Sequence, residues 1–380
     1  MTNESVLLAG IAGLSLAYVG LYWRAVERWA LEPSGAASAQ RLVPACPRIT
    51  FFRPLKPGVP DLRAKLEMLV MAARADDQIL FGADAGSPEA ALCEEVRARY
   101  PGRDLAVVRC VPDAARNPKI SKLVQMEPHA RHEHWLLSDS EALLDAEFCE
   151  AFRGEWAESG ADALTAAYRF CHARSWPQRL DAAAVLLTLL PGLAVLRGSV
   201  KFTLGACTAV RRGEVGGWKR FGDELAEDHC LGRMLAAAGK TVRLSARLAT
   251  LECDPLGWRD YWRHQRRVAV TYRAANPAGF AASVLVNGEL WCALLVARGE
   301  PALGLALGAA ILAARVLAAG RMARRLEVAA PGLAALLVAR AVETVCWAAS
   351  WFTRTVWWSG RRWRVRFRGK LVCPMPRAPH

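Results

Sequence analysis

The chain has 380 residues, of which 53% are hydrophobic and 23% are charged, and its net charge is +14. This composition argues against wholesale disorder, and the length allows two ordinary domains or one domain with membrane segments. The eleven cysteines include no C-x-x-C pair, which argues against a disulfide framework or a structural zinc site and favours reduced thiols in the cytoplasm. The positive charge suits an anionic membrane, a polyanionic ligand or nucleic acid.

The first predicted element is a membrane helix over residues 5–23, an uncharged apolar run of about the length that spans a bilayer. Glu4 precedes it and no basic residue does, so a retained anchor is favoured over a signal peptide. Arg24 and Arg28 follow the run and predict that the next segment lies in the cytoplasm.

A soluble α/β domain is predicted next. Short apolar strand patterns alternate with helical spacing, which predicts a mainly parallel sheet. The predicted strands cover 49–52, 78–82, 105–109 and 134–137, and the predicted helices cover 62–73 and 88–100. Ligands of such sheets bind beyond the carboxyl ends of the strands, where Asp84 and Asp139 lie.

The remaining apolar segments are less regular. Residues 182–196 are apolar but contain Pro191-Gly192, so we expect a broken helix that lies in the membrane surface or is buried. Three longer apolar runs follow, over 280–297, 302–320 and 331–352, with Asn287, Glu289, Arg315, Arg340 and Glu343 among them. Three crossings would place the basic C-terminal tail outside, so we expect one run to lie in the interface or pack against the others. The arginines and tryptophans interleaved over 357–368 suit a lipid interface.

Three carboxylate sites suit transfer of a sugar from a nucleotide diphosphate, which needs a cation for the leaving anion and a base for the acceptor hydroxyl. Asp84 lies in a loop of small residues and could hold ribose or uracil, and Asp139-Ser140-Glu141 could hold a metal–diphosphate. Glu227-Asp228 opens an apolar helix and could supply the base. A turn aspartate, a helix cap and helix-dipole partners are the respective structural alternatives.

Two basic segments could meet phosphate. Lys119 lies in the loop Asn117-Pro118-Lys119-Ile120, and the run 263–273 contains four arginines before the C-terminal apolar segments. A solvated lysine and the flank of a membrane helix are the alternatives.

The order and spacing of these motifs resemble the ceramide glucosyltransferase family, including its bacterial hopanoid-biosynthesis branch. The opening Arg53-Pro54-Leu55-Lys56-Pro57-Gly58 is similar to the family's K-P-L-x-G segment. The resemblance continues through Asp84, Asn117 to Ile120, Ser138 to Ser140, Ala226 to Asp228, residues 272–291 and residues 357–365. The family's D, D, D, (Q/R)-x-x-R-W pattern ends differently here, because His264 stands at the Gln/Arg position and Val268 at the Trp position.

The resemblance implies an inverting GT-A glycosyltransferase in which Asp228 is the catalytic base. It implies that Asp84, Lys119, Asp139 and Arg267 bind the nucleotide-sugar and that Asp139 and Glu141 hold Mg²⁺ or Mn²⁺. Lacking the family Trp, the site loses an aromatic platform, for which Tyr261, Trp262 or Tyr272 could substitute.

The predicted organisation is a transmembrane anchor (1–30), a cytoplasmic GT-A domain with a mainly parallel sheet (44–275), C-terminal membrane helices (279–358) and a basic tail (359–380). The resemblance implies an integral protein of a bacterial inner membrane that transfers a hexose from a UDP-sugar, UDP-glucose first, to a lipid such as ceramide, without a nucleic-acid partner. A hopanoid or diacylglycerol acceptor, with UDP-N-acetylglucosamine or UDP-glucose as donor, is the enzymatic alternative. Two alternatives of another class are a membrane protein that binds nucleic acid or anionic lipid without chemistry, and a catalytically degraded family member.

Overall fold

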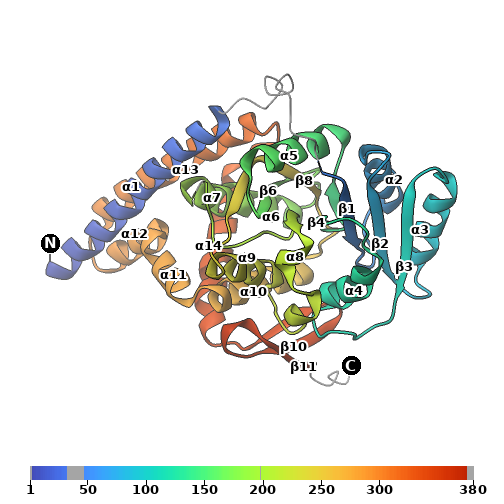
Figure 1. Cartoon of the computed structure of the whole chain (residues 1–380). Helices are drawn as coiled ribbons and strands as arrows, with labels where there is room; N and C mark the ends of the chain where they lie inside the picture. The colour runs from blue at the N-terminus through green and yellow to red at the C-terminus, as the bar shows by residue number, and fades with distance from the viewer. Residues whose placement is uncertain (1, 32–46, 197, 375–380) are drawn as a thin grey trace. The chain divides into compact units, whose positions relative to one another are not determined.

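The computed structural model describes residues 2–31, 47–196 and 198–374. Their contacts divide them into two compact units (Figure 1). The α/β unit contains residues 47–172, 198–255 and 357–374, and the helical unit contains residues 2–31, 173–196 and 256–356. Each unit is therefore assembled from three separate stretches of the chain.

An eight-stranded mixed sheet organises the α/β unit, in the order β3-β2-β1-β4-β7-β6-β8-β5. The strands are β1 (Ile49–Pro54), β2 (Gln78–Asp84), β3 (Asp104–Cys110), β4 (His134–Ser138), β5 (Ala142–Leu143), β6 (Ala163–Cys171), β7 (Cys207–Arg211) and β8 (Val242–Glu252). The first four strands pair in parallel, while β7 runs antiparallel to both β4 and β6. The four predicted strands thus form the parallel half of the sheet, as expected.

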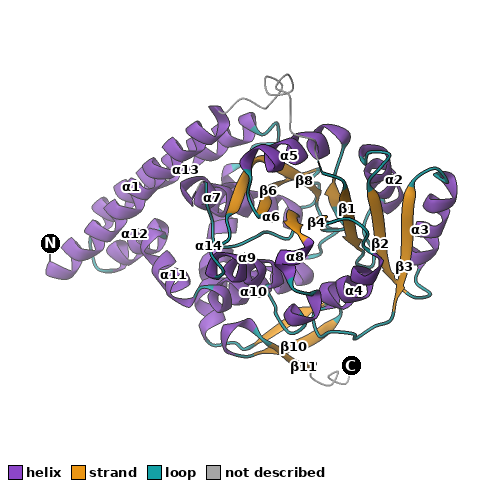
Figure 2. Ribbon diagram, in the orientation of Figure 1, coloured by secondary structure: helices purple, strands orange, loops and turns teal. Residues whose placement is uncertain are grey.

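The helices of this unit follow the strands as in a doubly wound fold (Figure 2). They are α2 (Leu62–Ala72), α3 (Pro88–Arg99), α4 (Pro118–Met126), α5 (Ala146–Ser159), α8 (Arg212–Val215) and α9 (Glu227–Ala237), with short turns η1 (Glu127–His129) and η3 (Trp218–Phe221). Every residue of β1 is buried. A parallel strand covered on both faces has a continuous apolar sequence, which explains why β1, β2 and β4 could be predicted.

The main core lies between the sheet and one layer of helices. Ile49 and Phe51 of β1 and Phe81 of β2 pack in one cluster with side chains of α2, α3 and α5, such as Leu66 and Phe152. Helix α4 packs against β1, β2 and β3 and returns the chain from the edge strand β3 to β4. A crossover in this direction places α4 on the opposite face from α2 and α3.

A second, three-stranded sheet contains β9 (Thr355–Trp358), β10 (Arg361–Val365) and β11 (Leu371–Pro374), with the turn η5 (Phe367–Gly369) before β11. Residues 357–374 belong to the α/β unit, and we call them the C-terminal strap. Trp363 and Leu371 are buried, whereas Arg362, Arg364 and Arg366 are exposed. The strap therefore has one packed face and one basic face.

The helical unit holds the apolar segments. Its helices are α1 (Asn3–Leu31), α6 (Trp176–Ala184), α7 (Leu190–Leu196), α10 (Trp258–Ala275), α11 (Pro277–Ala282), α12 (Gly288–Ala297), α13 (Pro301–Arg325) and α14 (Leu333–Trp351), with turns η2 (Val185–Leu189) and η4 (Ser283–Val286). Four helical stretches within the described residues are long and apolar enough to cross a membrane. The segments Pro277–Val286 and Gly288–Ala297 form a fifth candidate that is bent by 56°. These helices indicate membrane association, and the bent pair coincides with the first of the three predicted C-terminal runs.

The charged residues in these apolar helices pair with one another. Arg315 Nε lies 2.8 Å from Glu289 Oε1, and Arg340 contacts both Glu289 (3.5 Å) and Glu343. Thr188 Oγ1 donates to Glu343 over 3.0 Å. Ionisable side chains inside an apolar bundle are tolerated when they neutralise each other, so this network accounts for the interrupted hydropathy of the two later runs.

The expectation of a broken helix at Pro191-Gly192 is wrong. Helix α6 continues through the π-turn η2 into α7, and residues 176–196 form one 21-residue candidate span. The Leu190 amide donates to the Val185 carbonyl, five residues back, and Pro191 follows directly. Because proline has no amide hydrogen to offer, the wider turn accommodates the missing donor without ending the helix.

Candidate active site

Two predicted carboxylates lie at the same edge of the parallel sheet. Asp84 is the last residue of β2, and Asp139 follows the last residue of β4. Strand β1 pairs in parallel with both β2 and β4, so the carboxyl ends of the three strands meet at this edge. This edge is the usual ligand side of a doubly wound sheet.

Helix α4 brings two lysines to these carboxylates. Asn117 caps the helix, and its side-chain oxygen accepts hydrogen bonds from the amides of Lys119 (2.9 Å) and Ile120 (3.1 Å). Pro118 occupies the first turn, where a missing amide hydrogen costs nothing. Lys119 Nζ lies 2.7 Å from Asp139 Oδ1, and Lys122 Nζ lies 2.7 Å from Asp84 Oδ1. The spacing of three residues places both ammonium groups on one face of the helix.

The third carboxylate site, Glu227-Asp228, forms the first turn of α9. Thr203 Oγ1 donates to the Asp228 carbonyl over 2.7 Å, and the Asp228 carboxylate accepts a hydrogen bond from the His229 amide, also over 2.7 Å. Gly232 permits this packing, because a Cβ there would lie 2.2 Å from the Phe202 backbone. The start of α9 is therefore held against the segment that precedes β7.

The first turns of α4 and α9 meet through Lys119. Its ammonium lies 3.3 Å from Glu227 Oε1 as well as 2.7 Å from Asp139, and Asn117 Nδ2 donates to the other oxygen of Glu227 over 3.0 Å. The structure thus brings Lys119, Asp139, Glu227 and Asp228 together, as part of one cluster. Three carboxylates share one close lysine, which leaves an excess of negative charge.

This charge imbalance shows in the acid–base properties of the cluster. Burial and the neighbouring carboxylate of Glu227 raise the pKa of Asp228 to about 7, against the pull of Lys119. Burial also raises the pKa of Asp139, although Lys119 opposes the shift. Burial alone would lower the pKa of Lys119. The nearby carboxylates of Asp139 and Glu227 outweigh this effect, so the pKa of Lys119 is raised. A carboxyl with a pKa near neutrality is suited to accept a proton at physiological pH.

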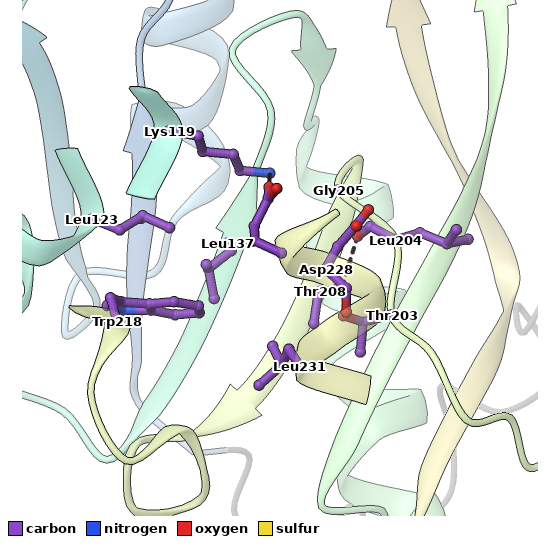
Figure 3. A pocket seen from close by; sticks show the side chains of 11 residues that line it. Lys119, Leu123, Leu137, Thr203, Leu204, Gly205, Thr208, Trp218, Asp228 and Leu231 are labelled. Atoms are coloured by element: carbon purple, nitrogen blue, oxygen red, sulfur yellow. Dashed lines mark hydrogen bonds and ion pairs between the residues drawn. The ribbon is translucent and has the colours of Figure 1, made fainter. Parts of the chain in front are cut away.

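A pocket opens beside this cluster, with an empty volume of about 310 Å³ that includes open solvent. Lys119, Glu227 and Asp228 supply its charged wall, and the rest is lined by Leu123, Leu137, Thr203, Leu204, Gly205, Thr208, Trp218 and Leu231. Figure 3 shows Lys119 and Trp218 on one side of the pocket and Asp228 on the other. The mixture of apolar walls with a few charged groups is typical of a ligand site.

Arg53 organises the loop that carries Asp139. It is fully buried on β1 and donates to Ser138 Oγ (3.1 Å), to the Ser140 carbonyl (3.1 Å) and to the Ala142 carbonyl. Burial lowers the pKa of Arg53 to about 10, which still leaves it charged at neutral pH. One guanidinium thus holds the Ser138 side chain on one side of residue 139 and two backbone carbonyls on the other.

The predicted metal ligand Glu141 has other partners in this structure. One carboxylate oxygen contacts Lys56 Nζ, which also lies 2.7 Å from Asp254, and the other accepts from Ser140 Oγ over 2.7 Å. Lys56, opposing the effect of burial, lowers the pKa of Glu141. To bind a metal, Glu141 would have to leave these partners.

A divalent cation fits the cluster if one protein carboxylate holds it. Lys119 contacts Asp139 Oδ1, and a Cβ on Gly205 would lie 3.0 Å from Asp139 Oδ2, so the absence of that side chain keeps space beside Oδ2. The excess negative charge favours a cation there. No group of three or more His, Cys, Asp or Glu residues in the described part of the chain could hold a metal alone. Diphosphate and water oxygens would complete the shell, as is usual for Mg²⁺.

Arg267 is the predicted site residue that belongs to the helical unit, on α10. Its Nη2 lies 3.1 Å from His264 Nδ1, so the two residues that match the family's (Q/R)-x-x-R positions contact each other. The role of Arg267 at the diphosphate stays a prediction.

Sequence reasoning left four contributors out of the predicted site: Asn117 as the cap that also holds Glu227, Lys122 as the partner of Asp84, Gly205, and Trp218 in the pocket wall. The Asn117-Pro118 start and the lysines three residues apart were visible signals. Gly205 and Trp218 gave none, because their roles depend on contacts between distant segments.

The family model described as glycosyl transferase family 21 matches residues 11–371. No curated protein matches the chain.

Solved structures give the fold. The chain is similar to the mannosyltransferase PcManGT from Pyrobaculum calidifontis in complex with GDP-Man and Mn²⁺, with a TM-score of 0.52 and 19% identity over 90% of this chain and 98% of that one. S. aureus TarS 1-349 in complex with UDP-GlcNAc matches with a TM-score of 0.39 and 13% identity over 85% and 98%. The first likeness confirms the predicted α/β GT-A-like fold.

Proposed function

Because the chain belongs to glycosyl transferase family 21, and is thus a glycosyltransferase, we propose that it transfers a hexose from a UDP-sugar, UDP-glucose first, to the hydroxyl of a membrane lipid such as ceramide. The observation that supports this most directly is the cluster of Asp139, Glu227 and Asp228 around Lys119 at the carboxyl end of the sheet. The cluster combines a lysine ammonium, which can bind an anion, with a carboxylate suited to act as a base.

The proposed reaction is a single displacement with inversion. Asp228 accepts the proton of the lipid hydroxyl while the hydroxyl oxygen forms a bond to C1 of the hexose. The bond between C1 and the diphosphate oxygen breaks, and UDP leaves with the electron pair. Asp228 then returns the proton to water. Its pKa of about 7 means that a large fraction is ionised at neutral pH while the group remains basic enough to take a proton.

The donor is proposed to bind along the edge formed by β2 and β4. Asp84 would hold the nucleoside, while Asp139, with Lys119, would face the diphosphate, and Arg267 would steady the leaving group. A Mg²⁺ or Mn²⁺ ion, held by Asp139 and reached by Glu141 if it leaves Lys56, would neutralise negative charge on the diphosphate. Arg53 keeps Asp139 in place by its bonds to the loop on either side.

A lipid acceptor is supported by the apolar helices. Four candidate membrane spans lie in the same chain as the catalytic cluster, so the enzyme is proposed to be an integral protein of a bacterial inner membrane with its α/β unit in the cytoplasm. Its acceptor hydroxyl would lie at headgroup level. Such a hydroxyl is present in ceramide, in a hopanoid polyol and in diacylglycerol. Each of the three lipids is therefore a candidate acceptor to be tested separately.

The test measures UDP release by the full-length protein in vesicles that contain ceramide, a hopanoid polyol or diacylglycerol, with UDP-glucose or UDP-N-acetylglucosamine. We expect acceptor-dependent UDP release with one lipid. Asp228→Asn should reduce turnover by at least about a hundredfold, which is the rate enhancement that a general base usually contributes. Asp104→Asn is the matched control, because Asp104 begins β3 at the opposite edge of the sheet and pairs with Arg131.

Two outcomes would contradict the proposal. Undiminished turnover in Asp228→Asn would remove that residue from the role of base. A wild-type protein that binds the donor and transfers sugar to none of the lipids would support the degraded family member, which the Val268 departure suggests.

A further inference from the structure

The C-terminal strap pairs with the segment that leads into α9. The Leu371 amide donates to the Asp223 carbonyl over 2.6 Å, and the Leu225 amide donates to the Gly369 carbonyl over 2.9 Å. Glu224 and Lys370 form an antiparallel bridge between these two bonds. Residues 223–225 are thus held as an extra edge beside the strap, two residues before Glu227 begins α9.

Side chains tie the strap to the α/β unit at two further points. Lys370 Nζ lies 3.3 Å from Glu224 Oε1, and Arg361 Nη1 lies 2.9 Å from Asp113 Oδ1. Arg361 and Asp113 are both well exposed, and such exposed pairs contribute little energy. The backbone hydrogen bonds therefore carry most of the attachment.

Arg116 connects the strap to both catalytic helices. Its Nη1 lies 2.8 Å from Asp223 Oδ2 and 3.4 Å from the Leu371 carbonyl. The next residue, Asn117, caps α4, its amide donates to the Gly222 carbonyl over 2.8 Å, and its side chain donates to the Glu224 carbonyl over 2.8 Å. The loops before α4 and α9 are therefore joined to each other and to the strap.

We propose that the C-terminal strap is a positioning element of the active site, which holds the loops before α4 and α9 so that Asp228 keeps its place beside Lys119. Arg116 is the positioning residue and Gly369 the backbone position on which the attachment depends. The proposal rests on the proposed function in assigning the base role to Asp228. Its mechanical part, that the strap orders residues 222–230, stands on the contacts alone.

Two variants release the strap without touching the catalytic cluster. Arg116→Ala removes the contacts to Asp223 and Leu371. Gly369→Val puts a branched side chain at a φ of 83°, which L-residues rarely adopt, and so disturbs the carbonyl that accepts from Leu225. Arg116→Lys restores the positive charge and tests rescue. Arg364→Ala is the matched control, since the exposed Arg364 side chain makes no hydrogen bond or ion pair with another described residue.

Hydrogen exchange of the full-length protein tests the mechanical part. In Arg116→Ala and Gly369→Val, we expect amides of residues 222–230 to exchange at least about tenfold faster, while amides of β1 and β2 keep the wild-type rate and so report an intact fold. Arg364→Ala should match the wild type throughout. Unchanged exchange at residues 222–230 in both variants would overturn the proposal, whether or not the protein transfers sugar.

Steady-state kinetics test the catalytic part. A displaced base lowers kcat, and misplacement by about 1 Å can cost roughly a hundredfold. We expect kcat to fall at least about tenfold in both variants, with donor KM within about twofold and partial recovery in Arg116→Lys. Wild-type kcat in both variants would overturn the proposal. Absence of transfer by the wild type, with faster exchange in the variants, would refute the proposed function and leave the role of the strap in ordering the loop standing.

Discussion

Asp228 is the residue whose charge state should control the reaction. Its pKa lies at about 7 because burial and the Glu227 carboxylate disfavour its ionised form. The ionised carboxylate is the proposed base, so we expect kcat/KM for the acceptor to rise with pH and level off above about 7. Added Mg²⁺ or Mn²⁺ should move the midpoint to lower pH, because a nearby cation favours the carboxylate. A profile that is flat from pH 5 to 9 would contradict this assignment.

The same shift predicts an effect on stability. The pKa of Asp228 is raised from 3.8 to about 7 on folding, so the folded protein binds more protons than the unfolded chain between these values. The contribution of Asp228 to stability is therefore greatest below about pH 4 and is lost as the pH rises through 7. We expect Asp228→Asn to raise Tm at pH 8, where the wild type must bury an ionised carboxylate. Equal Tm values of wild type and variant at pH 8 would show that folding does not raise the pKa of Asp228.

Gly205 should affect how tightly UDP binds in the presence of a metal ion. A Cβ at this position would lie 3.0 Å from Asp139 Oδ2 and 3.3 Å from Lys119 Nζ. Gly205→Ala should therefore weaken UDP binding in the presence of Mn²⁺ by several-fold, measured by calorimetry, and Asp139→Ala should abolish the metal dependence. Gly102→Ala is the control, because its added Cβ would meet nothing within 4 Å. Wild-type affinity in Gly205→Ala, or full activity in excess EDTA, would argue against a cation beside Asp139.

At this scale the sequence indicated residues that the structure brings together, and their chemical roles stay predictions. Asp139 and Asp228 were chosen by residue type and by their position at the end of a strand or the start of a helix, and Lys119 as a lysine in a loop. The structure gathers all three. The lysine contacts that reach Asp84 and Asp139 depend on which face of α4 meets the sheet edge. The partners of Glu141 come from Lys56, far away in the chain, and spacing alone could not indicate them.

Among the elements, the helix of residues 176–196 contains the segment that was expected either to lie in the membrane surface or to be buried. Leu187 and Leu190 have exposed fractions of 3% and 0%, and Leu187 packs with Tyr261, Ala319 and Leu336 inside the helical unit. We therefore expect Leu187→Ser combined with Leu190→Ser to lower stability by several kcal/mol, because packed volume is lost and hydroxyls are buried. Thermal unfolding in detergent measures this. A normal Tm with a raised acceptor KM would restore the membrane-surface helix.

Glu289 offers a second test at the level of elements. It is the shared partner of Arg315 and Arg340, on the neighbouring helices α13 and α14. Glu289→Gln should lower stability by roughly 3–5 kcal/mol, because it leaves buried arginines without their full charge compensation. Glu300→Gln, at the residue before α13, is the control. A Tm equal to that of the control would show that the network is not needed for packing.

Elements with a continuous apolar pattern were predictable, and the others were not. The pattern of β1, β2 and β4 reflects burial on both faces, and β3 is an apolar edge strand with only part of its residues buried. In contrast, β7 pairs antiparallel with its neighbours, and the pairing of β8 with β6 contains an irregularity. The sequence of the strap alternates Arg with Trp or Val, which is a strand pattern as well as a membrane-interface composition. Only its packing against residues 223–225 distinguishes the two.

For the whole molecule, the apolar helices predict how the protein fractionates. With four candidate spans, it should stay in the membrane after washes with 1 M salt, where the Debye length falls to about 3 Å, and after alkaline washes. Release by salt alone would mean that the positive charge, and not the apolar helices, holds the protein to the membrane.

The discontinuity of the α/β unit has a consequence for synthesis. Its last contribution, residues 357–374, follows α13 and α14 in the chain, so the strap leaves the ribosome only after both apolar helices have been made. Domains generally fold during translation in order from the N-terminus, yet this unit must wait for its final strands. The loop before α9 would acquire its native hydrogen bonds last, and a chain truncated by translational arrest after α14 would carry every carboxylate of the proposed site and still be an immature enzyme.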